Sequence, residues 1–306
     1  MAEEHADGTV TPPRCPLCSG TRLQMWFCSR DDRWAAWGCE ECDLWFVWPP
    51  ESGDAESDPS GRAFFESAEY LETADEAYVA FRKQHLQRFR TILSRAVLQL
   101  ENPQEMSAIR AADVGCGIGT SVAAMQSMGM VATGCDFSAP LVERGRDIYP
   151  DLDLKCGVAD DLEDETYHLV SAFNIVEHIR DVHGFISTLH EKLVSGGLLV
   201  LETPDRYSLF QRVLAAIRRL GAIHHTLSQD GGHIYLFSRR ALEYLLTQHG
   251  FEIEDTWTMM SPHRELAEKT RRRKGPLASA ALGGIFGLSR ITGMKNRRIV
   301  VARRIQ

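Results

Sequence analysis

The stretch that most constrains this chain is AADVGCGIGTS, residues 111–121, in which glycine recurs at every second position. A short apolar run that contains Asp113 leads into Gly115, Gly117 and Gly119. Glycine costs backbone entropy in regular structure, so three in close succession indicate a loop whose backbone a ligand approaches closely. The helix expected after the loop would offer its N-terminal amides to that ligand.

The region beyond residue 108 alternates short apolar runs with helical patterns. This alternation predicts a parallel sheet with helices on both faces. Ligands of such sheets bind at the carboxyl ends of the strands, where the glycine run lies. The expected strands are 109–114, 131–136, 152–156, 168–174 and 197–203, and the expected helices are 119–128, 138–147, 182–194 and 238–249.

An acidic residue ends the second expected strand, in the segment TGCDFSA. A carboxylate at the position of Asp136 can accept both hydroxyls of a ribose, as in dinucleotide sites. A dinucleotide fingerprint that starts at Gly115 would need glycine at position 120, where Thr120 stands. The structural alternative for Asp136 is a helix N-cap, although Ser138 is the better cap candidate.

Several segments in order resemble class I S-adenosylmethionine (SAM)-dependent methyltransferases. DVGCGIGT resembles their motif I, and residues 157–205 resemble the rest of the core. Residues 231–253 are similar to the subgroup of ubiquinone-biosynthesis O-methyltransferases, and NRRIVVARRI (296–305) resembles the antiparallel last strand. The resemblance implies an α/β fold with a Rossmann-like, seven-stranded, mostly parallel sheet whose last strand is antiparallel.

The resemblance also implies a set of cofactor-binding residues. The three glycines would line the methionine and ribose part of SAM, and Asp113 would orient its amino group through the loop. Asp136 would take the ribose hydroxyls, Phe137 would flank the adenine, and Asp160 or, in an equally plausible register, Asp161 would lie near its exocyclic amine. The cofactor candidates are Asp113, Gly115, Gly117, Gly119, Asp136, Phe137, Asp160 and Asn174.

The catalytic candidates come from NIVEH and GGHIYLF. His178 follows Glu177 at the mouth of the fourth expected strand, where a neutral imidazole could take a proton from a substrate hydroxyl. Certain relatives carry E-x-x-E-H and a distant histidine that bind a divalent ion. Glu177, His178 and His233 could do so here, with Asn174 as a weaker ligand in place of the first glutamate. Alternatively, His178 caps a helix and His233 locks a lid loop.

Two C-x2-C pairs define a module at the front of the chain. Cys15, Cys18, Cys39 and Cys42 stand in CPLC and CEEC, with 20 residues between the pairs. Four thiolates satisfy the tetrahedral geometry of a closed structural zinc site. The alternative is four cysteines without metal. The stretch resembles the zinc-ribbon modules that precede some bacterial methyltransferase domains.

The sequence therefore predicts three regions. A four-cysteine zinc ribbon occupies residues 1–50, and an acidic linker with a helical front occupies residues 51–105. A SAM-dependent methyltransferase domain follows over residues 106–306. Two insertions are expected within that domain, namely a lid or cap at 206–232 and a basic, apolar segment at 261–295.

Charge is distributed unevenly. The net charge of −8 argues against nucleic acid as a partner, yet the chain from Ser261 onward has 12 Lys/Arg and 2 Asp/Glu. Residues 269–290 join a cationic cluster to an uncharged stretch that could lie on an anionic membrane or pack on the sheet. No signal peptide and no apolar run of membrane-spanning length is recognised. We expect a cytoplasmic protein, with peripheral membrane contact as an option.

The favoured function is methyl transfer from SAM to a hydroxyl of a small-molecule or sugar acceptor, either a secondary metabolite or a cell-surface glycan precursor. Methylation at nitrogen or carbon stays open. One alternative is an RNA- or protein-modifying enzyme in which the zinc ribbon docks the macromolecule. Another alternative is a protein that binds SAM without catalysis.

Overall fold

The computed structural model describes residues 14–28, 35–48, 81–100, 105–219, 233–261, 271 and 275–305. Residues 51–80, which hold the expected acidic linker, lie outside the described residues. The second half of the expected lid, 220–232, and most of the basic cluster also lie outside them.

A seven-stranded sheet forms the centre of the protein, in the order β10-β11-β8-β7-β4-β5-β6. β11 is antiparallel to both of its neighbours, whereas the pairs from β8 to β6 are parallel. This confirms the expected fold class, with its antiparallel last strand. The strands are β4 (Arg110–Val114), β5 (Val131–Asp136), β6 (Asp153–Cys156), β7 (Tyr167–Phe173), β8 (Leu193–Pro204), β10 (Phe251–Met259) and β11 (Arg297–Arg304).

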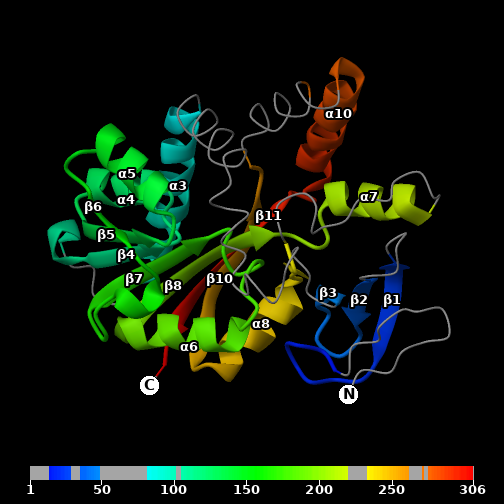
Figure 1. Ribbon diagram of the computed structural model, residues 1–306, viewed down its shortest axis with the longest axis horizontal. Coiled ribbons are helices and arrows are strands. Elements are labelled where there is room, and N and C mark those ends of the chain that lie inside the picture. Colours follow the sequence, from blue (N-terminus) through cyan, green and yellow to red (C-terminus); the bar gives the residue numbers. More distant parts are fainter. Residues whose placement is uncertain are drawn as a thin grey trace.

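Helices cover both faces of this sheet (Figure 1). Alternate residues of each strand point to opposite faces, so Ala111 and Leu169 pack beneath α3 and α4, whereas Ala112 and Val170 pack against α6 and α8. The helices are α3 (Arg82–Val97), α4 (Thr120–Ser127), α5 (Ala139–Ile148), α6 (Val182–Lys192) and α8 (Arg239–Gln248), with short 3-10 turns η1 (Met106–Ala108) and η2 (Ala159–Asp161).

The chain reverses its direction of travel across the sheet next to β4. It runs from β4 outward through β5 to β6 and then returns to β7 on the other side of β4. Loops after β4 and β7 therefore leave in opposite directions, and ligands of open α/β sheets bind at such a point, outside the carboxyl ends of the strands. The glycine loop, residues 115–119, lies at this point.

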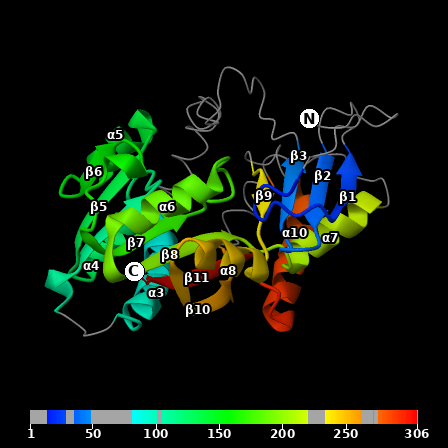
Figure 2. The same ribbon diagram turned by 90° about the horizontal axis from the view of Figure 1, so that it is seen from below.

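The cysteine module, the described residues between 14 and 48, folds as an antiparallel sheet of β1 (Leu23–Cys28), β2 (Ala35–Cys39) and β3 (Trp45–Trp48). A fourth strand, β9 (Tyr235–Leu236), completes this sheet from a part of the chain almost 190 residues further on (Figure 2). The two regions are therefore joined by backbone hydrogen bonds as well as by side chains.

The two expected insertions contain helices α7 (Leu209–Arg219) and α10 (Pro276–Thr292). These helices pack on each other, with the rings of Phe210 and Phe286 stacked at 6.4 Å between centroids and 16° between planes. No helix in the described part of the chain is long and apolar enough to cross a membrane.

Candidate functional site

The glycine loop has a left-handed backbone at all three glycines, with φ values of 71°, 53° and 79°. A Cβ at Gly115 would run into the Ile175 side chain, and one at Gly119 would lie 2.8 Å from a Leu154 methyl group. A Cβ at Gly117 would meet nothing within 4 Å. Gly115 and Gly119 are thus required by packing, whereas Gly117 leaves open space beside the backbone for a ligand.

Asp113 lies beneath this loop and is 2% exposed. Its carboxylate accepts hydrogen bonds from the hydroxyls of Ser121 on α4 and of Ser171 on β7, the latter at 2.5 Å. Burial raises the pKa of Asp113 to about 7, and the two hydroxyls oppose that rise. Asp113 therefore fixes the start of α4 to the sheet.

Asp136 connects the loops that follow β4 and β5. One carboxylate oxygen accepts the Gly117 N–H at 2.8 Å, and the other accepts the Ser138 N–H at 2.9 Å. Burial raises the pKa of Asp136, while these backbone donors lower it. Each oxygen keeps a second lone pair, so the residue can stabilise the start of α5 and still accept hydroxyl groups.

The two acidic residues after β6, Asp160 and Asp161, differ in what their side chains contact. The Asp161 carboxylate accepts the Val158 N–H at 2.8 Å and so closes η2. Asp160 is exposed, and its main-chain carbonyl accepts the Lys192 ammonium at 3.3 Å. The Asp160 side chain is therefore the better adenine candidate. Phe137 follows β5 directly and is half-buried.

Asn174 comes immediately after β7 and has a left-handed φ of 60°. Its N–H donates to the Glu202 carbonyl at 2.8 Å, which holds the turn at the strand end. The buried Oδ1 has no hydrogen-bond partner among the described residues. Asparagine tolerates this backbone better than most residues, and an unsatisfied buried oxygen beside the loop marks a position where a ligand can bind.

Three further candidate site residues, Glu177, His178 and His233, meet in space. The potential ligand atoms of Glu177, His178 and His233 all lie within 4.8 Å of one another, and we call this group the Glu–His–His cluster. Glu177 Oε1 is 3.9 Å from His233 Nε2, and the two imidazole rings are 4.7 Å apart between centroids. Glu177 and His178 lie in the loop after β7, and His233 comes just before β9.

Burial dominates the electrostatics of this cluster. It raises the pKa of the fully buried Glu177 to about 7, with Arg297 opposing the rise. Burial also lowers the pKa of His233 well below its usual range, and the nearby His178 and Arg297 add to the effect. His233 is therefore neutral at pH 7. Thr203 and the Glu177 backbone lie near enough to lower the pKa of Glu177, yet no donor among the described residues is within 3.5 Å of either of its carboxylate oxygens in hydrogen-bond geometry.

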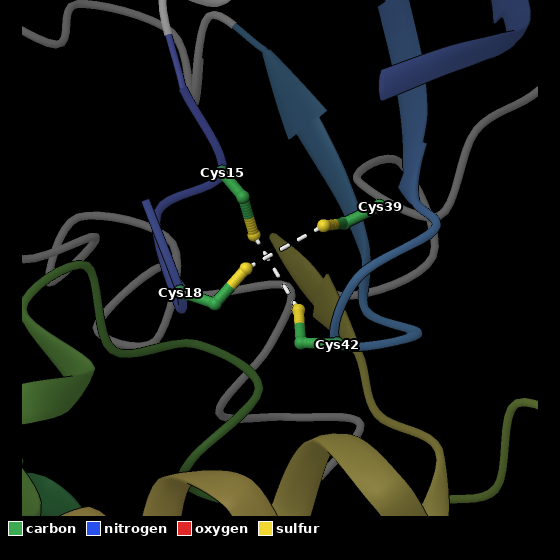
Figure 3. A group of neighbouring side chains, drawn as sticks. All are labelled: Cys15, Cys18, Cys39 and Cys42. Atoms are coloured by element: carbon green, nitrogen blue, oxygen red, sulfur yellow. Dashed lines mark hydrogen bonds between the residues drawn. The ribbon is translucent and has the colours of Figure 1, made fainter. Parts of the chain in front are cut away.

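The four cysteines of the module converge on one point (Figure 3). Cys15 Sγ is 3.6 Å from Cys42 Sγ, and Cys18 Sγ is 3.5 Å from Cys39 Sγ, so each close pair joins the two C-x2-C segments. Zn–S bonds of about 2.3 Å place tetrahedral sulfurs about 3.8 Å apart. A hydrogen bond from Cys42 lowers the pKa of Cys15 to about 6. The cluster thus fits zinc in both donor set and spacing.

One group of contacts beside the cysteines could not be predicted from the sequence. Asp43, which follows Cys42 and has a φ of 66°, accepts hydrogen bonds from the Arg206 guanidinium on its carbonyl and carboxylate oxygens. The Tyr207 hydroxyl also donates to the carboxylate, at 2.9 Å. The Arg206 guanidinium lies over the Trp45 ring, 4.6 Å from its centroid. The partners are more than 160 positions apart, so no local pattern could connect them.

The strand order, the open glycine loop and the acidic residue at the end of β5 together define a class I SAM-dependent methyltransferase. A family model described as "Methyltransferase domain" matches residues 80–256, more than half of the chain. The chain belongs to this family. The cysteine module lies outside the matched residues.

Curated relatives include two ubiquinone biosynthesis O-methyltransferases. The one from Rhizobium leguminosarum bv. trifolii is 28% identical over 165 residues, which cover 51% of this chain and 64% of the relative. The one from Brucella ovis is 31% identical over 111 residues, which cover 34% of this chain and 44% of the relative. The chain therefore spans less than two thirds of the length of these relatives.

Solved structures share the fold at low sequence identity. Phosphoethanolamine N-methyltransferase 2 of Haemonchus contortus, in complex with SAM, has a TM-score of 0.53 at 18% identity, over 80% of this chain and 60% of that chain. A SAM-dependent methyltransferase from Thermotoga maritima has a TM-score of 0.52 at 16% identity, over 79% of this chain and 98% of that chain.

Proposed function

We propose that this methyltransferase transfers the methyl group of SAM to a hydroxyl of a small-molecule or sugar acceptor, either a secondary metabolite or a cell-surface glycan precursor. The proposal is supported above all by the Glu–His–His cluster, in which a buried carboxylate meets two half-buried imidazoles beyond the end of β7. The relatives are named for O-methylation, which favours a hydroxyl acceptor.

The residues around the glycine loop fit the donor. The open side of Gly117 leaves room for its tail, and Asp136 keeps acceptor capacity for the ribose hydroxyls. Phe137 and Asp160 are proposed to hold the adenine, and Asp113 to keep the loop in place. SAM supplies a methyl group on a positively charged sulfur, so the protein has to align the acceptor, exclude water and take up a proton.

His178 is proposed as the group that takes the proton from the acceptor hydroxyl. A neutral imidazole suits this step near pH 7, and the Glu177 carboxylate beside it would stabilise the imidazolium that forms. A divalent ion held by Glu177, His178 and His233 is a second candidate. It is favoured by the Glu177 oxygens, which have no hydrogen-bond partner among the described residues. Asn174 would be a weaker oxygen donor than a carboxylate.

Titration calorimetry with SAM and with its demethylated product tests the donor site, and we expect heat of binding for both. A mass-spectrometric screen of hydroxylated acceptors should then reveal a product heavier by one CH2. Absence of binding heat would rule out the proposal. Binding without turnover would favour a non-catalytic SAM-binding protein, and methylation of RNA or protein would favour a macromolecular substrate docked by the cysteine module.

The cysteine module is proposed to hold one structural zinc ion through Cys15, Cys18, Cys39 and Cys42. Four thiolates leave no open position on the metal, which argues for stability and against catalysis at this site. Metal analysis of the purified protein should give one zinc per chain. Replacement of Cys18 by serine should release that metal, whereas replacement of the distant Cys156 should not.

The outer face of α10 is proposed to contact an anionic membrane. Leu277, Leu288 and Ile291 are 87%, 51% and 84% exposed, and Arg271 and Arg290 carry positive charge at the two ends of this segment. The chain from residue 269 onward contains no Asp or Glu. An apolar helix face with flanking cations suits the headgroup region of acidic lipids.

Sedimentation with vesicles tests this contact. We expect binding to phosphatidylglycerol vesicles and weak binding to phosphatidylcholine vesicles. The double variant Leu288→Gln/Ile291→Gln should bind the acidic vesicles about a hundredfold more weakly, because burial of two aliphatic side chains contributes about 3 kcal/mol. Thr292→Ser on the same helix is the matched control. Equal binding by the double variant and the wild type would contradict the proposal.

A further inference from the structure

We propose that the cysteine module is a positioning element for the Glu–His–His cluster, and that it acts through the shared strand β9. The inference rests on the proposed role of this cluster at the acceptor side. It assigns to the module a task in aligning the site, beyond holding its own metal.

The first observation is the place of β9 between the module and the cluster. On one edge it pairs with β3, through Phe46 opposite Tyr235, and the Val47 N–H donates to the Ile234 carbonyl at 3.0 Å. On the other side the N–H groups of Ile234 and Tyr235 donate to the Glu177 carbonyl at 2.9 and 3.2 Å. Three backbone segments are thus hydrogen-bonded side by side, and the third one carries Glu177.

His233 directly precedes Ile234, so the same strand also sets the place of this histidine. A two-residue strand is too short to hold its position alone, because even a complete two-stranded hairpin is only marginally stable in water. The pairing with β3 and the packing of Leu236 against Val47, both fully or almost fully buried, supply the missing support. Loosening the module should therefore loosen both His233 and the Glu177 backbone.

The second observation is that each cysteine segment contacts the methyltransferase domain. In CPLC, the carbonyl of Leu17 is 2.8 Å from Nε2 of His183 on α6. After CEEC, Asp43 binds Arg206 and Tyr207, which follow the end of β8. A metal bound by all four cysteines would fix the CPLC and CEEC segments relative to each other. It would therefore keep both contacts with the methyltransferase domain in place. The module is thus fixed at three places around the cluster.

The cofactor residues share none of these contacts. Gly117, Asp136 and Asp160 belong to the loops after β4, β5 and β6, on the other side of the direction change in the sheet. A substitution that loosens the module should therefore loosen the backbone at Glu177 and His233. The affinity for S-adenosylhomocysteine should stay the same. A module that merely adds global stability would affect both sites together.

Asp43→Asn in the full-length chain is the test variant. Asparagine accepts the left-handed backbone of Asp43, while the ion pair to Arg206 is lost. We expect the amides of Ile234 and Tyr235 to exchange hydrogen about tenfold faster, because local opening governs their exchange. Amides of β4 should exchange as in the wild type, and calorimetry should give the same affinity for S-adenosylhomocysteine within about twofold.

Glu41→Gln is the matched control. The Glu41 carboxylate accepts the N–H groups of Thr21 and Arg22 and pairs with the Arg22 guanidinium, so these partners all lie within the module. Exchange should become faster at those two amides and not at Ile234. Tyr207→Phe, which removes a single hydroxyl donor, should produce a smaller change of the same kind as Asp43→Asn.

Unchanged exchange at Ile234 and Tyr235 in Asp43→Asn, alongside faster exchange across residues 35–48, would overturn the inference. Equal acceleration at β4 would also overturn it, since it would reveal a purely global role. Removal of metal with a chelator should reproduce the Asp43→Asn pattern. A different result would contradict the proposed function, namely that calorimetry of the wild type detects no binding of S-adenosylhomocysteine.

Discussion

The two halves of the site are built in different ways. The cofactor half comes from consecutive strand–loop units between Asp113 and Asp161, each of which ends at the same edge of the sheet. The Glu–His–His cluster instead depends on segments that start near residue 15 and reach residue 237. The first half follows from local chain geometry, whereas the second follows from contacts between distant parts of the chain. The halves should therefore respond separately to mutation.

The largest expected effect is on the cluster. His178→Ala should lower turnover by about 10²–10⁴-fold, the usual contribution of a positioned general base, while affinity for SAM is kept. The measurement is kcat on the acceptor found in the screen, with calorimetry for SAM. His190→Gln, a histidine on α6 that packs on Phe251, is the control. Full activity of His178→Ala would place the base elsewhere.

Asp136→Ala should instead weaken SAM binding while the fold stays intact. Loss of the carboxylate removes its charged hydrogen bonds and should weaken SAM binding about a hundredfold, since each such bond contributes about 1.5–3 kcal/mol. Calorimetry measures the affinity, and circular dichroism checks the fold. Asp161→Asn, which changes a carboxylate that closes η2, should bind SAM almost normally. Wild-type affinity in Asp136→Ala would refute its role at the ribose.

Alanine at Gly117 should affect mainly SAM binding, whereas alanine at Gly119 should affect mainly stability. Gly117→Ala places a methyl group in open space and should weaken SAM binding about tenfold, with a strain of about 1–2 kcal/mol from its backbone angle. Gly119→Ala forces a contact with Leu154 and should lower the melting temperature more. Thermal melts and calorimetry on both variants make the comparison. The opposite ranking would mean that Gly117 does not face the ligand.

A further expected effect concerns pH. The pKa of Asp113 is raised to about 7, so the folded protein keeps a proton that the unfolded chain releases near pH 4. The free energy of unfolding should fall as the pH rises from about 4 to 7. Glu177 contributes with the same sign. Asp113→Asn should reduce this slope in urea titrations at several pH values; an unchanged slope would contradict the assignment.

The fold could be predicted from the sequence because strand periodicity and the spacing of the glycine motif are local properties. The pairing of Glu177 and His178 with the distant His233 was suggested by the resemblance to relatives and by no local pattern. The sequence also predicted four convergent cysteines. It left Asp160 and Asp161 undecided, since a shift of one residue in a turn changes no pattern. It could not indicate β9, because two residues carry too little periodicity, or the Asp43–Arg206 pair, because charge partners across 163 positions have no spacing rule.

The strand shared between the module and the domain has a consequence for solubility. A chain cut at the boundary of the family match, near residue 80, would lose β3 and leave the outer edge of β9 without a partner. Leu236 and Tyr235, now buried, would then be exposed beside unpaired backbone groups. Exposed edges of this kind attract other chains into intermolecular sheets. The front module thus covers the edge of β9 that a truncated chain would expose.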